Sequence, residues 1–238
     1  MTDADSPEIH HQHRDVTGGW LRPTVFGMMD GLVSNFALIA GVAGAGSSVS
    51  VRAVSLAGLA GLVGGAFSMA AGEYVSVQSQ NESAQAEIDV ERHELRYNMA
   101  AEQAELAQMY VERGVEPGLA RRVAAQLSRD PDQALTIHVR EELGMDPLGL
   151  PSPWTAAGSS LLSFSLGALI PLLPYLLGGK VLWLSAVLAL VALFGAGALT
   201  SQFTERGWLF AGTRQLLLGG LAAGVTYGVG QAFGAVVG

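Results

Sequence analysis

The sequence predicts an all-α membrane protein in which five membrane-crossing helices carry one polar helical insert. Half of the 238 residues are hydrophobic and only 14% are charged, and the mean hydropathy is +0.35. This is not the composition of an ordinary soluble domain. A membrane crossing takes about 20 helical residues, and five apolar segments are long enough: residues 24–46, 53–77, 154–178, 180–201 and 214–236.

Composition divides the chain into four predicted parts. In order they are a polar cytoplasmic tail, two membrane helices, a helical insert and three membrane helices, at residues 1–22, 23–78, 79–148 and 149–238. The insert carries most of the charge, and its helical pattern is expected to break at Gly114, Pro117 and Pro131. We therefore expect an amphipathic helical domain outside the membrane, between the second and third membrane helices.

Charge and cysteine content limit the chemistry that the chain can perform. The net charge of −8 argues against nucleic acid as a partner. The chain has no cysteine, which excludes disulfides, thiolate metal sites and cysteine catalysis. Carboxylate, imidazole and thioether groups remain as the available metal ligands.

The basic residues predict how the chain is oriented in the bilayer. With five crossings, Arg52 and Lys180 fall on one side, and the other 11 of the 13 Lys and Arg residues fall on the opposite side. Lys and Arg are enriched in the cytoplasmic segments of membrane proteins. The N-terminus and the insert are therefore expected in the cytoplasm, and the C-terminus on the other side.

Two acidic residues lie inside predicted membrane helices. Asp30 is about two turns from the cytoplasmic end of the first helix, and Glu73 is about one turn from the same end of the second. A charge inside a bilayer is costly, so such residues usually face a cavity or a partner. Met69 shares the helix face of Glu73, and carboxylate with thioether suits a borderline divalent metal such as Fe²⁺. Alternatively, Asp30 only hydrogen-bonds a neighbouring backbone group and Met69 only packs.

Six glutamates of the insert fall on one side of a predicted continuous helix. At about 100° per residue they occupy an arc of about 80°: Glu87, Glu91, Glu94, Glu102, Glu105 and Glu112. An apolar set follows the same period beside them: Ile88, Leu95, Met99, Leu106 and Tyr110. Because like charges repel at helical spacing, divalent cations are the expected compensation, as in carboxylate bundles. The alternative is an acidic surface that simply faces solvent.

Histidines offer two further groups of possible ligands. His138 and Glu142 are four residues apart, so they share one face of a helix in the insert. The tail contains the sequence HHQH, which could also bind metal. A polar terminus of this kind is more often incidental, so we expect the metal site in the insert.

Long motifs connect these features to a known family. They are DGLVSNFALIAGVAGA in the first span, LAGLAGLVGGAFSMAAGEYVSVQSQNE through the second, GVEP and ELG in the insert, and PLLPYLL in the third span. With them the chain resembles the vacuolar iron transporter family over almost its whole length from Arg22. The resemblance implies a five-span homodimer with a cytoplasmic metal-binding domain and proton-coupled export of Fe²⁺, often with Mn²⁺. In a bacterial member the implied location is the cell membrane.

The resemblance also implies site residues. Asp30 matches the transport carboxylate of the first span and Met69 the methionine of the second, and we add Glu73 to this transport path because of its depth. The insert ligands that it implies are Glu91, Glu94, Glu102, Glu105, His138 and Glu142, with His138 standing where plant-like members have a methionine. Two positions depart from the family pattern: Gln108 replaces an insert glutamate, and Gly61 replaces a carboxylate of the second span.

The leading hypothesis is a divalent metal transporter that exports Fe²⁺ or Mn²⁺ from the cytosol in exchange for protons, with Zn²⁺ as another ion that the insert could bind. The alternative is a membrane-anchored metal sensor or buffer without transport. A mere anchor has no use for acidic residues inside the membrane, which favours the transporter. An enzyme is disfavoured because the insert has no pair of Glu-x-x-His motifs of the kind used by di-metal bundles.

Overall fold

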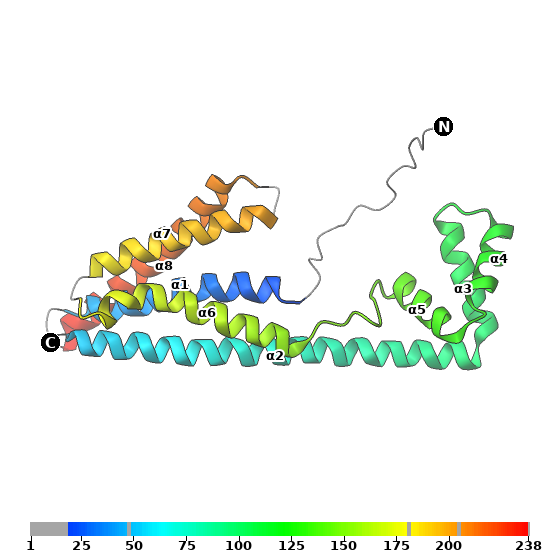
Figure 1. Cartoon of the computed structure of the whole chain (residues 1–238), viewed down its shortest axis with the longest axis horizontal. Helices are drawn as coiled ribbons and strands as arrows, with labels where there is room; N and C mark the ends of the chain where they lie inside the picture. Colours follow the sequence, from blue (N-terminus) through cyan, green and yellow to red (C-terminus); the bar gives the residue numbers. More distant parts are fainter. Residues whose placement is uncertain (1–18, 47–48, 180–181, 204–205, 238) are drawn as a thin grey trace, which may run out of the picture. The chain divides into compact units, whose positions relative to one another are not determined.

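The structure is a computed structural model that describes residues 19–46, 49–179, 182–203 and 206–237. This part of the chain is helical and contains no strand, so the predicted all-α class is confirmed. Figure 1 labels the helices α1 (Leu21–Gly44), α2 (Val51–Tyr97), α3 (Met99–Glu112), α4 (Pro117–Leu127), α5 (Pro131–Glu142), α6 (Pro153–Leu176), α7 (Leu182–Thr200) and α8 (Trp208–Val237). A 3-10 turn, η1 (Ser201–Phe203), follows α7. The HHQH motif of the tail lies outside the described residues.

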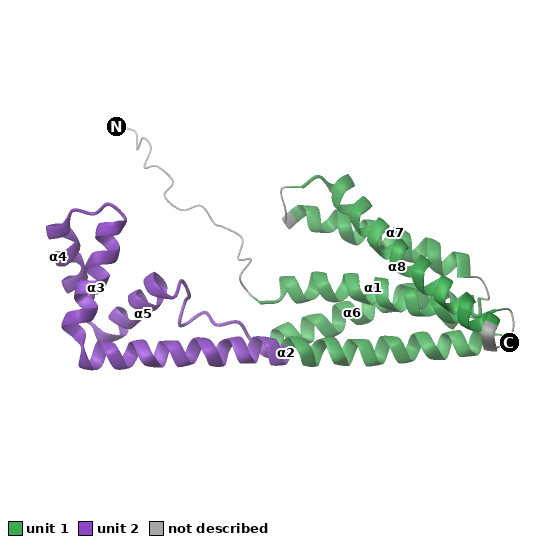
Figure 2. Cartoon of the chain, turned by 180° about the vertical axis from the view of Figure 1, so that it is seen from behind, with its two compact units in different colours: residues 1–73, 154–238 green, residues 74–153 purple. Residues whose placement is uncertain are grey.

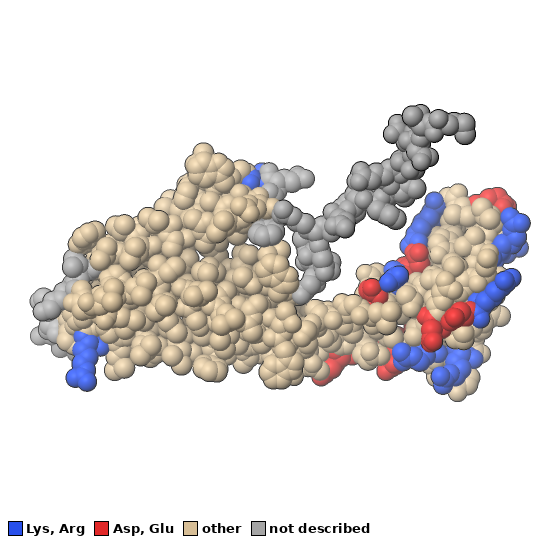
Figure 3. Space-filling model, viewed as in Figure 1, with Lys and Arg blue, Asp and Glu red and all other residues tan. Residues whose placement is uncertain are grey.

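The chain forms two compact units, which Figure 2 colours separately. Residues 1–73 and 154–238 form the first, which we call the membrane unit, and Tyr74–Pro153 forms the second, which we call the insert unit. Charged side chains gather on the insert unit, whereas the visible surface of the membrane unit is almost entirely uncharged (Figure 3). The predicted insert, residues 79–148, falls inside the insert unit.

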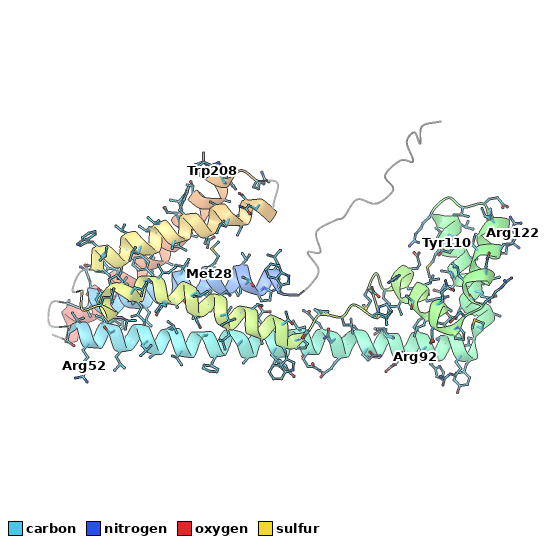
Figure 4. The ribbon with its side chains drawn as sticks, in the orientation of Figure 1. Met28, Arg52, Arg92, Tyr110, Arg122 and Trp208 are labelled. Atoms are coloured by element: carbon cyan, nitrogen blue, oxygen red, sulfur yellow. The ribbon has the colours of Figure 1, made fainter. Side chains whose placement is uncertain are left out.

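Five helices of the described chain are long and apolar enough to cross a membrane: α1, α2, α6, α7 and α8. Their apolar outer faces are exposed in the isolated chain, as expected for surfaces that contact lipid or another membrane protein. Arg52, in the first turn of α2, is exposed and projects outward (Figure 4). These features are those of a multi-pass integral membrane protein.

The second membrane helix is much longer than the sequence suggested. The apolar crossing predicted at residues 53–77 is the first part of a longer helix, because α2 continues without interruption to Tyr97. Residues 74–97 contain no Gly or Pro and are rich in Glu and Gln, so nothing in them stops a helix. Glu73 consequently lies inside a continuous helix and not one turn from a helix end.

Within the membrane unit, α1 and α6 approach each other closely through glycines. A Cβ atom on Gly31 would lie 2.3 Å from the carbonyl oxygen of Phe164, and one on Gly167 would lie 2.4 Å from the carbonyl oxygen of Met28. Only glycine allows helix backbones to approach to this distance. The contact completely buries Leu32 and leaves Asn35 only 2% exposed.

Two apolar clusters hold the remaining helices of the membrane unit to α1. The first joins α1 to α7 and α8 and consists of Phe36, Ala40, Ala189 and Ala223. The second joins α1 to α2 and α6 and consists of Ile39, Val54, Leu172 and Tyr175. α1 is therefore the central helix of this unit.

In the insert unit, Asn98 separates α2 from α3. Its φ of −127° and ψ of 28° are not helical, and its side-chain amide donates a hydrogen bond to the Glu94 carboxylate. The prediction of one continuous helix through all six glutamates is therefore wrong, because α3 turns away from the axis of α2 (Figure 1). The break at Asn98 was hard to predict from sequence, because the helix propensity of asparagine is only about 0.7 kcal/mol below that of alanine.

The other breaks in the insert unit follow the sequence. Gly114 has a φ of 95° after α3, and Pro117 and Pro131 are the first residues of α4 and α5, where a missing N–H costs nothing. The side chains of Glu116 and Asp130 each accept two backbone N–H groups at these helix starts. The short helices can therefore fold back on one another, and they share a small core of Leu106, Ala107, Ala120 and Ala124, against which Ile137 packs.

Candidate functional site

The insert unit gathers three carboxylates around one histidine. His138 Nδ1 lies 3.0 Å from Glu142 Oε1, 3.1 Å from Glu91 Oε1 and 3.7 Å from Glu102 Oε2. Glu91 comes from the end of α2, Glu102 from the first turn of α3, and His138 with Glu142 from α5. We call these four residues the carboxylate–histidine cluster. It depends on the break at Asn98, because that break lets α3 bring Glu102 to the glutamate of α2.

The dimensions of this cluster suit one metal ion. Each of the four residues offers a ligand atom, and these atoms all lie within 4.8 Å of one another. First-row divalent metals bind nitrogen and oxygen at about 2.0–2.2 Å, so two ligands on opposite sides of the ion are about 4.0–4.4 Å apart. A contraction of a few tenths of an ångström would therefore close all four ligands around an ion, and carboxylate oxygens with imidazole suit Fe²⁺, Mn²⁺ or Zn²⁺.

Without a cation, the three carboxylates of the buried cluster have only one histidine beside them. His138 is fully buried, and Glu91 and Glu102 are each only 7% exposed. One ring N–H cannot serve three carboxylates: His138 Nδ1 is hydrogen-bonded to Glu142 Oε1, and Glu91 Oε1, although 3.1 Å from the same nitrogen, is buried without a hydrogen bond among the described residues. Burial, and then the negative charges of Glu142 and Glu102, raise the pKa of Glu91 to about 7. Burial and the neighbouring charge of Glu105 also raise the pKa of Glu102, although His138 acts in the opposite direction.

The membrane unit contains a second group of possible ligands. A cavity of about 300 Å³ lies between α1, α2 and α6. Its lining includes the Asp30 carboxylate, the Met69 thioether, and the polar side chains of Asn35 and Ser68. We call it the Asp30–Met69 cavity. Asp30 also lines a neighbouring cavity of about 440 Å³, which includes Arg22 and Gln215.

The amino-acid sequence that forms the cavity and the cluster is similar to proteins of a known family. The family model described as the VIT family matches residues 21–231. This chain belongs to the VIT family. Vacuolar iron transporter 1 of Oryza sativa subsp. japonica is 32% identical over 98% of this chain and 94% of its own length. The vacuolar iron transporter of Acanthamoeba castellanii is 36% identical over 90% and 78%, and vacuolar iron transporter 1 of Arabidopsis thaliana is 32% identical over 92% and 88%.

In this VIT-family protein, four of the six expected insert ligands come together: Glu91, Glu102, His138 and Glu142. Glu94 is half-buried and accepts its hydrogen bond from Asn98. Glu105 is exposed but close enough to influence the pKa of Glu91 and of Glu102. Glu94 and Glu105 therefore border the cluster without belonging to it.

The remaining expected residues are distributed differently. Glu87 and Glu112, the other members of the predicted stripe, are exposed, and Glu112 accepts a hydrogen bond from Gln108. Of the three residues expected on the transport path, Asp30 and Met69 share the Asp30–Met69 cavity, and half-buried Glu73 does not line it.

Sequence reasoning about this VIT-family protein overlooked Asn35, Ser68 and Gln215, which line the two cavities beside Asp30. The available signal was a polar side chain within an apolar span. An amide or hydroxyl is less costly to bury than a charge, so it attracts less attention in a sequence. Only the arrangement of the helices identifies which of them face a cavity.

The raised pKa of Glu91 predicts how metal binding depends on pH. A metal must displace the proton of this carboxyl, so we expect affinity for Mn²⁺ to fall by about tenfold per pH unit as the pH drops below 7. A carboxyl with the ordinary pKa of 4.5 would be ionised throughout the range from pH 8 to 6, so it would add no such pH dependence. Equilibrium dialysis of the detergent-purified protein at several pH values would measure this dependence. A flat profile across that range would contradict the prediction.

Proposed function

We propose that this protein is a divalent metal transporter that exports Fe²⁺, with Mn²⁺ as a second cargo, from the cytosol in exchange for protons. The observation that carries the proposal is the Asp30–Met69 cavity, which holds a carboxylate and a thioether inside the membrane unit. The cost of placing an acid there is reasonable if it binds a cation in transit. The names of the curated relatives, which are vacuolar iron transporters, support iron as the cargo.

The two groups of ligands have separate roles in this proposal. The carboxylate–histidine cluster collects metal in the cytosol, and Asp30 and Met69 bind it in the membrane, with Glu73 as a further carboxylate of the path. A carboxylate that binds either a proton or a metal provides a simple basis for exchange, since protonation releases the metal. The distribution of basic residues supports a cytosolic insert, and the resemblance to the family supports a homodimer in the cell membrane.

Metal uptake by proteoliposomes tests this proposal. Purified protein is reconstituted into vesicles that contain a metal-sensitive dye or a pH-sensitive dye, and Fe²⁺ under anaerobic conditions or Mn²⁺ is added outside. We expect metal to enter and the luminal pH to rise, because protons leave as metal enters. Protein-free vesicles and vesicles given Mg²⁺ are the controls. Metal uptake without any pH change would contradict proton exchange.

A metal sensor or buffer is the second candidate, and the carboxylate–histidine cluster alone would suffice for it. The same experiment separates the two functions. A sensor would bind Mn²⁺ in equilibrium dialysis and move none into vesicles, whereas a transporter would do both. Binding without uptake would therefore overturn the transport proposal and leave the sensor.

A further inference from the structure

Asn35 is a buried polar residue with one unused hydrogen-bonding atom. It lies on α1 and is only 2% exposed. Its Nδ2 donates a 2.7 Å hydrogen bond to the carbonyl oxygen of Ala168 on α6. Its Oδ1 is buried and has no hydrogen-bond partner among the described residues. Buried amide oxygens are normally paired, so this one calls for an explanation.

The orientation of this amide follows from its single hydrogen bond. The carbonyl oxygen of Ala168 can only accept, so the amide nitrogen must face it. A flipped amide would place two oxygen acceptors against each other and lose the bond. Oδ1 must consequently face the other way.

Oδ1 packs against a glycine of the neighbouring helix α2. Gly61 on α2 lies opposite, and a Cβ atom there would be 2.9 Å from Asn35 Oδ1 and 2.5 Å from Leu38 Cδ2. Asn35, Leu38 and Gly61 all line the Asp30–Met69 cavity. The unpartnered oxygen therefore belongs to a residue in the wall of the cavity that also contains the Asp30 carboxylate and the Met69 thioether.

We propose that Asn35 Oδ1 is a ligand for the divalent cation at a second position of the membrane path, deeper than Asp30. This inference rests on the proposed transport function. Asn35 is five residues further along α1, which is about 7.5 Å along the helix axis. An amide oxygen is a hard, neutral ligand that binds Mn²⁺ and Fe²⁺ more weakly than a carboxylate does.

A neutral second ligand suits a path through which an ion must pass. Transport needs binding that is strong enough to admit the ion and weak enough to release it. Asp30 supplies the charge that attracts the cation, and Asn35 accepts it at the next step without holding it by a second charge. The hydrogen bond that Asn35 Nδ2 donates to the Ala168 carbonyl holds Oδ1 in place, because the side-chain amide cannot rotate without losing that hydrogen bond.

The first test is Asn35→Leu, which preserves the approximate size of the side chain and removes the oxygen. In proteoliposomes we expect the KM for Mn²⁺ to rise by at least about tenfold, as for other changes that disturb metal binding. Ser163→Ala is the matched control, because Ser163 is also buried and bonds α6 to the Pro23 carbonyl of α1 outside this cavity. The control should retain the KM of the parent. A lower thermal stability of Asn35→Leu with an unchanged KM would show a purely structural role and overturn the inference.

The second test blocks access to Oδ1 without substituting Asn35. Gly61→Ala places a methyl group against Oδ1 and changes no atom of Asn35 or Ala168, although the Leu38 side chain must move aside, so it serves even if Asn35→Leu does not fold. We expect the KM for Mn²⁺ to rise again, whereas Gly158→Ala, whose Cβ would meet nothing within 4 Å, should not change it. A parent protein that moves no metal would overturn the proposed function, and this inference with it. A transporting parent with an unchanged KM in Gly61→Ala would overturn the role of Asn35 alone.

Discussion

Replacing Asp30 with alanine is expected to reduce Fe²⁺ and Mn²⁺ transport in proteoliposomes to background. Among the described residues, Asp30 is the only acidic one that lines the Asp30–Met69 cavity, so no other described charge in that cavity can substitute for it. Loss of groups that merely orient a metal ligand already costs about 10–100-fold, so loss of the charged ligand itself should cost at least about 100-fold. Initial rates of metal uptake would measure the effect.

Two further variants show whether charge or shape is lost. Asp30→Asn keeps the size of the side chain and should be as inactive as Asp30→Ala, because a neutral amide attracts a dication far less. Thr24→Ala is the control on the same helix, since the Thr24 hydroxyl donates its hydrogen bond to the carbonyl of Trp20, the residue that precedes α1. It should transport at the rate of the parent. Parent-like transport by Asp30→Asn would eliminate Asp30 as the intramembrane ligand.

Replacing Glu91 with glutamine is expected to have opposite effects on the metal-free and the metal-bound protein. Glu91 is buried beside Glu102 and Glu142, and its pKa of about 7 means that the fold disfavours its ionised form. Because the pKa of Glu91 is raised from 4.5 to about 7 in the folded protein, the free energy of unfolding falls as the pH rises through this range. A glutamine, which is neutral at every pH, should therefore raise the Tm of the metal-free protein at pH 8. The same change removes a ligand, so Mn²⁺ affinity should fall by at least about 100-fold.

Thermal unfolding of the full chain in detergent, with and without Mn²⁺, would measure both effects. A bound metal stabilises the folded state, so Mn²⁺ should raise the Tm of the parent and hardly that of Glu91→Gln. Glu87→Gln is the matched control, because Glu87 lies one turn away on the same helix and is exposed. Its response to Mn²⁺ should equal that of the parent. If Glu91→Gln kept the full Mn²⁺ response, the carboxylate–histidine cluster would not be the binding site.

Much of the helical framework was predictable from local sequence. Long apolar segments indicated five membrane helices, and Pro117 and Pro131 indicated the starts of α4 and α5. Periodicity also identified part of the core, since Ile88, Leu95 and Leu106 are buried as their spacing suggested. These features depend on residues close together in the chain, whose effects can be read without knowing the tertiary fold.

The predicted ligand set was less accurate because it assumed an unbroken helix. On such a helix Glu91, Glu94, Glu102 and Glu105 share one face, but the turn at Asn98 places Glu91 and Glu102 together and leaves Glu105 exposed. Helical spacing relates residues only while the helix continues. One asparagine, with a modest effect on propensity, was enough to change which glutamates meet.

The sequence by itself determined that this is a multi-pass helical membrane protein of the VIT family, with acidic residues in both of its parts. Only the tertiary structure decided which side chains share a site. It brought Glu91, Glu102 and His138 together from three helices, and it placed Asn35 with Asp30 in the lining of one cavity. Hydropathy and helix propensity act between near neighbours, whereas a binding site depends on how separate helices pack, and that packing is a property of the whole fold.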